Sequence, residues 1–217
     1  MQRDRTQERE HQRKIAQGVS HGGIIDPEAL VRNMIERAIL QTPRLELRRF
    51  TSEDADWFAA LFADPEVTRH LGGPRTRAQA DEMFATRVLG YYAAHPGLGI
   101  WMTIERQTGR AVGFHLLNHI HGEAIVQVGF GLEQSAWGKG YGTEMAREVL
   151  RYGFEDLHLP HIAAIANLEN TASQHVLEKI GLVRRGERAF SHPAYASQGL
   201  LAWFEQDAEG WRASRRG

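Results

Sequence analysis

The sequence predicts a mixed α/β fold, with one sheet and its flanking helices in a single domain. Three observations support this prediction. Short apolar runs of strand length alternate with longer stretches whose apolar residues recur at helical spacing. Their order along the chain is strand, two helices, three strands, helix, strand, helix and two strands, which is typical of a mixed sheet. The 217 residues are 42% hydrophobic, which is enough for one substantial core.

The first 41 residues are set apart from that domain. Residues 1–25 are charged and polar, and we interpret them as a mobile arm. Residues 26–41 open with an aspartate N-cap and a proline, so we predict a short amphipathic helix followed by a linker. The apolar stripe of that helix consists of Leu30, Val31, Met34, Ile35 and Ala38. It must be buried either on the domain itself, which is the simpler alternative, or on a second copy in a homodimer.

The domain proper, residues 42–217, opens with an alternating strand at 44–50 and two helices. The first helix begins at 51–54, where two hydroxyl residues precede two acids, and the second spans 76–94. Glycine, proline and asparagine delimit the later elements. These are strands at 100–106, 110–120, 122–132 and 161–166, helices at 142–156 and 170–180, and closing strands at 182–190 and 198–206.

Composition excludes several classes of function. The formal net charge is −1, so no overall field recruits nucleic acid or an anionic membrane. The chain has no cysteine, which removes disulfides, thiolate metal sites and a cysteine nucleophile, and fits the reducing cytoplasm. No apolar run approaches the roughly 18 residues of a membrane span, and no signal-peptide pattern opens the chain. We therefore expect a soluble cytoplasmic protein.

A glycine-rich loop at 137–142 reads Trp-Gly-Lys-Gly-Tyr-Gly, and a helix begins directly after it. Glycine at every second position permits left-handed backbone and close approach to a ligand, while the helix N-terminus adds partial positive charge. The loop therefore suits a phosphate or pyrophosphate; the alternative is a plain connection that turns the chain. A P-loop motif is absent, and the dinucleotide fingerprint would need glycine where Thr143 stands.

Three segments give the chain a family resemblance. Residues 137–144, then Asn170-Thr171-Ala172-Ser173 and the run 177–182, resemble the GNAT N-acetyltransferases. The openings at 42–48 and 64–67 are most similar to the RimJ/RimL-like branch, which acetylates ribosomal-protein N-termini. The resemblance covers residues 42–211. It implies a mixed, mostly antiparallel sheet whose fourth and fifth strands splay apart around acetyl-CoA, the co-substrate.

The resemblance also implies roles for the loop and its surroundings. Backbone amides of Gly138, Gly140 and Gly142 would cradle the pyrophosphate; Lys139 would add charge or simply be solvated. A strand bulge near Gly129-Phe130 would hold the acetyl carbonyl, with a backbone N–H stabilising the oxyanion. The coenzyme contacts implied in this way are Phe130, Trp137, Gly138, Lys139, Gly140, Tyr141, Gly142, Thr143, Asn170 and Ser173.

Two polar residues at the next helix start complete the implied site. Asn170 would hydrogen-bond the pantetheine arm, and its alternative role is that of a helix N-cap. Ser173 would protonate the leaving thiolate, and its alternative is a polar residue in the first helical turn. We favour the functional interpretation of both because they occur as a pair.

The sequence departs from the family at Gln127, where a glutamate is the usual general base. An amide cannot accept the proton. Another group on these strands would have to serve, such as Glu123, His115, His119 or His121; or water relays the proton; or the amine arrives neutral. An α-amine, with a pKa near 7.7–8.0 against about 10.4 for lysine, suits the last route, so we predict an α-amine or another amine of low pKa as acceptor.

Other interpretations remain weaker. The pair His119 and His121 has spacing that suits a metal, but without thiolates or a third ligand nearby we interpret it as surface imidazoles and expect no metal.

The leading function is direct acetyl transfer from acetyl-CoA to an amine in a ternary complex. The alternative is a non-catalytic acyl-CoA-binding module or sensor, and the glycine spacing disfavours a nicotinamide oxidoreductase. The acceptor stays open between a ribosomal-protein terminus, another peptide, an antibiotic amine and a small metabolite.

Overall fold

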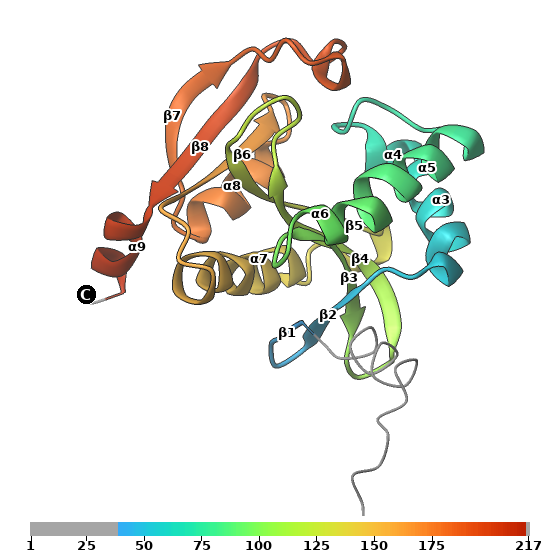
Figure 1. Cartoon of the computed structure of the whole chain (residues 1–217), viewed down its shortest axis with the longest axis horizontal. Helices are drawn as coiled ribbons and strands as arrows, with labels where there is room; N and C mark the ends of the chain where they lie inside the picture. Colours follow the sequence, from blue (N-terminus) through green and yellow to red (C-terminus); the bar gives the residue numbers. More distant parts are fainter. Residues whose placement is uncertain (1–38, 216–217) are drawn as a thin grey trace, which may run out of the picture. The chain divides into compact units, whose positions relative to one another are not determined.

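A computed structural model describes residues 39–215, all of which belong to one compact unit (Figure 1). The predicted arm and N-terminal helix, up to residue 38, lie outside the described residues. Within these, eight strands form one sheet in the order β1-β2-β3-β4-β5-β6-β8-β7. The strands are β1 (Leu40–Gln41), β2 (Leu45–Arg49), β3 (Gly99–Glu105), β4 (Arg110–His119), β5 (Val126–Leu132), β6 (His161–Asn167), β7 (Val183–Arg188) and β8 (Leu201–Asp207). The predicted mixed α/β class is confirmed.

The helices cover both faces of this sheet. They are α3 (Ala55–Ala63), α4 (Pro65–Thr68), α5 (Arg77–Met83), α6 (Gly90–Ala94), α7 (Tyr141–Arg151), α8 (Thr171–Lys179) and α9 (Ala208–Ser214). Two π-helical segments, Phe84–Leu89 and Tyr152–Asp156, continue α5 and α7 respectively. The predicted helices at 76–94 and 142–156 are therefore each one run of helix that includes a π-turn. No helix within residues 39–215 has the length and apolar character needed to cross a membrane.

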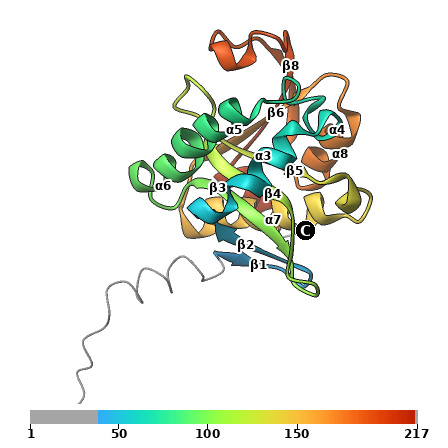
Figure 2. The same ribbon diagram turned by 90° about the vertical axis from the view of Figure 1, so that its right-hand side faces the viewer.

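Of three apolar clusters within residues 39–215, the two largest follow from the alternation of side chains along the strands. On one face α7 packs Met145 and Val149 into a core with Leu117 of β4 and Ile162 of β6. On the other face the helices of residues 55–94 pack aromatic side chains onto Met102 and Phe114. Figure 2 looks onto this second layer, with α3 and α5 in front of the strands. Each strand in the middle of the sheet is thus buried on both sides.

The strands β5 and β6 run parallel but remain paired at one place, Gln127 opposite Ala163. Beyond it they separate, and this separation positions the site. The bulge predicted near Gly129-Phe130 is wrong, because β5 keeps a continuous antiparallel register with β4 from Val126 to Leu132. The opening comes from the loss of pairing with β6 rather than from an extra residue.

Several boundaries differ from the prediction. The strand expected from residue 122 begins at Val126, because the N–H of Ile120 donates to the carbonyl of Ile125 and closes a turn there. β1 lies in the predicted linker, and its Leu40 is buried. The short α4 and the closing α9 were not predicted. The last strand, β8, lies between β6 and β7, so β7 rather than β8 forms that edge of the sheet.

Candidate active site

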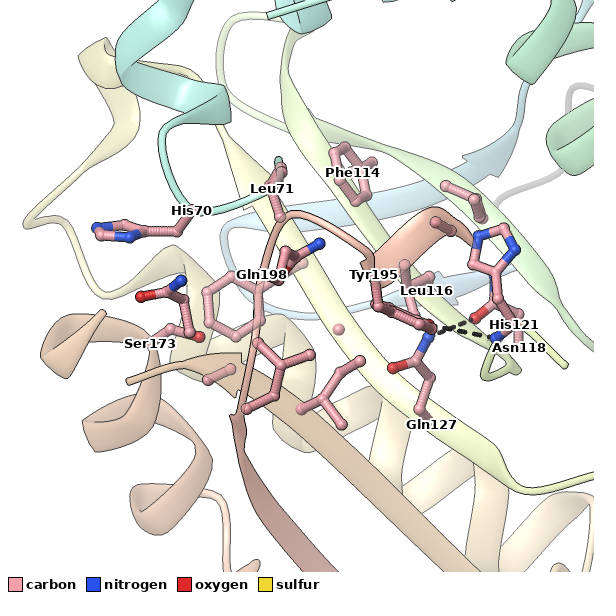
Figure 3. Close-up of a pocket in the computed structure, with 18 of the residues that line it drawn as sticks. His70, Leu71, Phe114, Leu116, Asn118, His121, Gln127, Ser173, Tyr195 and Gln198 are labelled. Atoms are coloured by element: carbon pink, nitrogen blue, oxygen red, sulfur yellow. Dashed lines mark hydrogen bonds between the residues drawn. The ribbon is translucent and has the colours of Figure 1, made fainter. Parts of the chain in front are cut away.

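A cavity of about 430 Å³ opens where β5 and β6 separate. Its walls come from β4, β5 and β6, from the start of α8, and from two loops at residues 70–75 and 194–198. Figure 3 shows polar side chains from these elements pointing into one space, with Ser173 on one side and Asn118 and Gln127 on the other. No aspartate or glutamate within residues 39–215 lines it.

Gln127 lies on the cavity wall and is only 8% exposed. It stands opposite Asn118 in the β4–β5 ladder, and its Nε2 donates to Asn118 Oδ1 at 3.3 Å. Cross-strand neighbours have side chains on the same face of a sheet, which explains the pair. A buried amide held in this way has neither charge nor a lone pair basic enough to take a proton from an ammonium.

Asn170 and Ser173 meet at the N-terminus of α8, and both line the cavity. Asn170 caps the helix, because its Oδ1 accepts from the backbone N–H of Ser173 at 3.0 Å. The N-cap role considered as an alternative is confirmed. It occupies the amide oxygen and leaves the Nδ2 donors of Asn170 available. The Ser173 hydroxyl makes no hydrogen bond with any described residue, so it too is available to a ligand.

The glycine loop leads into α7 with the conformation that its glycines permit. Gly138 and Gly140 have φ of 72° and 79°, in the left-handed region that side chains disfavour. Gly140 is the N-cap of α7, and no side chain caps the helix in its place. The first N–H groups of a helix have no helical acceptor, so those of α7 are free for an anion. The loop thus has the left-handed glycines and the uncapped helix N-terminus on which the predicted phosphate site depends.

Arg44 and Glu144 hold this loop against the rest of the domain. Arg44 donates through Nη1 to the carbonyl of Lys139 at 2.9 Å and through Nε to Glu144 at 2.6 Å. Glu144 also accepts from the Thr42 hydroxyl at 2.6 Å. Burial by itself would raise the pKa of Glu144, but hydrogen bonds from Thr42 and Arg44 outweigh it and lower that pKa. A negative charge in the first turn also suits the helix N-terminus.

The aromatic ring of Phe130 connects the loop to the cavity. The ring lines the cavity, and a methyl group added at Gly142 would lie 3.3 Å from it. Trp137 lies in the loop, with its indole N–H donating to the carbonyl of Leu132 at 2.8 Å, and is 44% exposed. A ligand could therefore lie across the loop and extend past Phe130 into the cavity.

The other proton acceptors considered from the sequence lie in separate places. His115 is fully buried outside the cavity lining, with Nδ1 2.7 Å from the Thr103 hydroxyl, and burial lowers its pKa to about 3. His119 contacts the Tyr91 hydroxyl and meets the His95 ring edge-on, and it does not line the cavity. Glu123 lies in the turn before β5 rather than on the strand, paired with Arg188 at 2.7 Å. Of these candidates only His121 lines the cavity.

His121 is a weak base in this setting. Burial, together with the charge of Arg87, lowers its pKa to about 4. Its backbone N–H donates to the Tyr195 hydroxyl at 3.2 Å, and its ring lies 4.9 Å from that of His192. No group of three or more histidines or carboxylates within residues 39–215 is arranged to hold a metal ion.

Comparison with known proteins identifies the family. The profile of the family described as "Acetyltransferase (GNAT) domain" matches residues 44–183. The chain belongs to the GNAT acetyltransferases. It is 34% identical over 154 residues, 68% of this chain and 84% of the relative, to the uncharacterized N-acetyltransferase YoaA of Bacillus subtilis. It is 31% identical over 153 residues to the FsC-acetyl coenzyme A-N(2)-transacetylase of Aspergillus fumigatus, covering 66% of this chain and 64% of that protein.

Solved structures share the GNAT fold. The crystal structure of a ribosomal-protein-S5-alanine acetyltransferase from Vibrio fischeri aligns with a TM-score of 0.62 at 19% identity, covering 79% of this chain and 97% of that one. The protein is accordingly an acetyl-CoA-dependent acyltransferase, as members of the GNAT family are.

Some residues around the GNAT site were not singled out from the sequence. Arg44 belongs to a predicted strand, and its partner Glu144 lies 100 residues further along the sequence. Tyr195 and Gln198 reach the cavity from the loop between β7 and β8, which no periodicity marks. Arg87 reaches it from the π-helical segment. The sequence marks Arg87 only as a basic residue on a predicted helix, which is a weak signal for a binding site.

Proposed function

We propose that this GNAT enzyme transfers the acetyl group of acetyl-CoA directly to a primary α-amine, at a peptide or protein N-terminus or on a small molecule. One observation carries the proposal: no carboxylate of residues 39–215 lines the cavity, and an amide, Gln127, lies on its wall. A site without a strong base works on an amine that has already lost its proton. At pH 7 an amine of pKa about 7.8 is neutral about 300 times more often than one of pKa about 10.4.

The coenzyme would lie across the glycine loop. Free amides of Gly138, Gly140 and Gly142 suit the pyrophosphate, because they join left-handed turns to a helix N-terminus. The Nδ2 group of Asn170, left free by the cap, suits a pantetheine carbonyl. Phe130 lies between loop and cavity and suits the end of the pantetheine arm.

The transfer would proceed in a ternary complex. The amine nitrogen forms a bond to the acetyl carbon, and the carbonyl becomes an oxyanion. When that intermediate collapses, the C–S bond breaks and its electron pair goes to sulfur, which takes a proton from the Ser173 hydroxyl. The proton that nitrogen releases goes to water, and serine regains its own from solvent. A covalent enzyme intermediate is not needed, and the sequence has no cysteine to form one.

Within the family we favour the RimJ/RimL-like branch. The support is the similarity of the chain's opening segments and the shared fold of the Vibrio fischeri ribosomal-protein acetyltransferase. The alternative, a non-catalytic acyl-CoA sensor, rests on Gln127, which lacks the basicity of the usual glutamate.

The test uses two peptides of the same sequence. One has a free α-amine and no lysine; the other has an acetylated N-terminus and one lysine. Free thiol released from acetyl-CoA is followed at pH 7 with the purified chain. We expect release with the first peptide and a rate about 300-fold lower with the second. A preference for the lysine would contradict the α-amine proposal, and coenzyme binding without release from any amine would support the sensor.

A further inference from the structure

The cavity carries positive charge and no negative charge among its described lining residues. Its charged lining residues are the arginines Arg75 and Arg87. Arg75 is occupied, because its guanidinium donates to the carbonyls of Leu71, Gly72 and Gly73 at 3.1, 2.9 and 2.7 Å. It therefore stabilises the loop at 70–75 and has little capacity left for a ligand.

Arg87 is different, because it makes no ion pair and no hydrogen bond with any of residues 39–215. Its guanidinium lies 5.9 Å from the ring centre of Tyr91. Its positive charge acts on His121 and on the Tyr195 hydroxyl, both of which line the cavity. Glu123 is an acid whose charge also acts on Tyr195, and it is paired with Arg188 at 2.7 Å.

A half-buried guanidinium with only an aromatic ring beside it has lost hydration that no anion or hydrogen-bond acceptor of the described residues replaces. Burial lowers the pKa of Arg87 from its ordinary value, although arginine stays protonated. An anion that enters the cavity would restore the lost interaction, since guanidinium binds carboxylate and phosphate through two parallel hydrogen bonds. A polycationic amine would meet the same charge as repulsion, with no carboxylate of the described lining to offset it.

We propose that the acceptor is an amine that carries an anionic group, a carboxylate or a phosphate, and that Arg87 is the specificity-determining residue that binds this group. The inference rests on the proposed acetyl transfer and names its substrate class. It places the anion of the acceptor near His121 and Tyr195, with the amine toward Gln127, in a single cavity.

Matched acceptors test the proposal. β-Alanine is compared with β-alaninamide, O-phosphoethanolamine with ethanolamine, and spermidine serves as the polycation. Thiol release is measured between pH 7 and 9.5, and kcat/KM is divided by the neutral fraction of each amine. We expect the anionic member of at least one pair to exceed its neutral partner by about 10- to 100-fold, since a hydrogen-bonded charge contributes on that scale. The larger of the two ratios distinguishes carboxylate from phosphate.

Three variants complete the experiment. Arg87→Gln should abolish the anionic preference, mainly by raising the KM for the anionic acceptor, while the KM for acetyl-CoA reports whether the coenzyme site is intact. Arg87→Lys should keep part of the preference because it keeps the charge. Arg77→Gln, an exposed arginine on the same run of helix and outside the cavity, should keep all of it. Circular dichroism checks that each variant is folded.

The outcomes separate the two proposals. Turnover with equal or greater preference for neutral amines or spermidine would overturn this inference alone. The same holds for an anionic preference that survives in Arg87→Gln. No thiol release from any amine, including the peptides above, would instead overturn the proposed function on which it rests.

Discussion

Replacing Gln127 by glutamate restores the usual general base of the family at the same place and tests the amine-protonation argument directly. Glutamate has nearly the same shape, so it should occupy the same place on the cavity wall, where Gln127 is 8% exposed. The new carboxylate cannot make the hydrogen bond that Gln127 Nε2 donates to Asn118 Oδ1 at 3.3 Å. Burial should raise the pKa of the new carboxyl toward the range in which a base works near neutral pH.

The expected effects can be estimated from this geometry. Wild-type enzyme should prefer an α-amine over a lysine ε-amine by about 300-fold at pH 7, from protonation alone. A positioned general base contributes about 10²–10⁴-fold, so the variant should reduce that preference at least about tenfold. The lost hydrogen bond and the buried carboxyl should lower the free energy of unfolding by about 1–3 kcal/mol, or the melting temperature by roughly 2–12 °C.

The assay measures kcat/KM for the paired peptides from pH 6 to 10. In wild type the rate should rise with pH up to the pKa of the amine. In Gln127→Glu, kcat/KM should show an additional rise at lower pH, in the range where the new carboxyl ionises. Gln127→Met is the control, since it loses the same hydrogen bond without gaining a base. It should share the loss of stability and keep the wild-type preference.

The result that would refute the reasoning is a folded Gln127→Glu that binds acetyl-CoA but keeps the wild-type ratio of α- to ε-amine rates. The proton would then leave through water or another group, and the identity of residue 127 would not determine the acceptor. An equal change in Gln127→Met would refute it as well, because that variant adds no base.

Four further predictions follow from the site. Ser173→Ala should lower kcat about 100-fold without changing the KM for acetyl-CoA, if it protonates the thiolate; steady-state kinetics measures both. Glu144→Gln should lower the free energy of unfolding at pH 7 by only about 1 kcal/mol, since its partner Arg44 is half exposed. The folded state lowers the pKa of Glu144, so the stability difference between wild type and variant should be full above about pH 5 and vanish as the pH falls through that pKa. Denaturation at several pH values measures this difference. Coenzyme A should quench part of the tryptophan fluorescence, and Trp137→Phe should remove that response, since the indole lies exposed in the glycine loop. Between pH 6.5 and about 3, the folded state keeps the His115 imidazole neutral while the unfolded chain protonates it. His115→Asn should therefore reduce the loss of stability on acidification by up to about 1.4 kcal/mol per pH unit. Urea denaturation at several pH values measures how the free energy of unfolding changes with pH in both proteins.

Local signals in the sequence predicted the glycine loop and the start of α8 well. Gly138 and Gly140 take the left-handed conformations that their residue type allows, and Asn170 caps α8 as its residue type favours. Such features depend on a few neighbouring residues and little on the rest of the chain. The mixed sheet was predictable for a similar reason, because each strand carries its own apolar pattern. The order of the last strands was not, since pairing β8 between β6 and β7 depends on contacts far apart in the chain.

The face of a strand was the main source of error in the site. Side chains along β4 alternate, so Phe114, Leu116 and Asn118 line the cavity while His115 lies in the opposite direction. Helices cover both faces of this sheet, so the apolar pattern alone does not tell which face holds the cavity. Arg87 was missed for a related reason: a π-turn adds a residue to its turn and shifts later side chains away from a regular helical pattern.

The lack of a carboxylate in the described cavity lining connects the two proposals about the acceptor. A carboxylate in the cavity would provide a base, but it would also pair with Arg87 and cancel its attraction for an anion. Without one, Arg87 keeps its charge for the acceptor and deprotonation is left to solvent. In a free zwitterion the anion stabilises the ammonium and raises the amine pKa. Pairing of that anion with Arg87 weakens this stabilisation, so the bound amine loses its proton more readily than the free one. Binding the acceptor through its anion thus compensates for the missing glutamate at position 127.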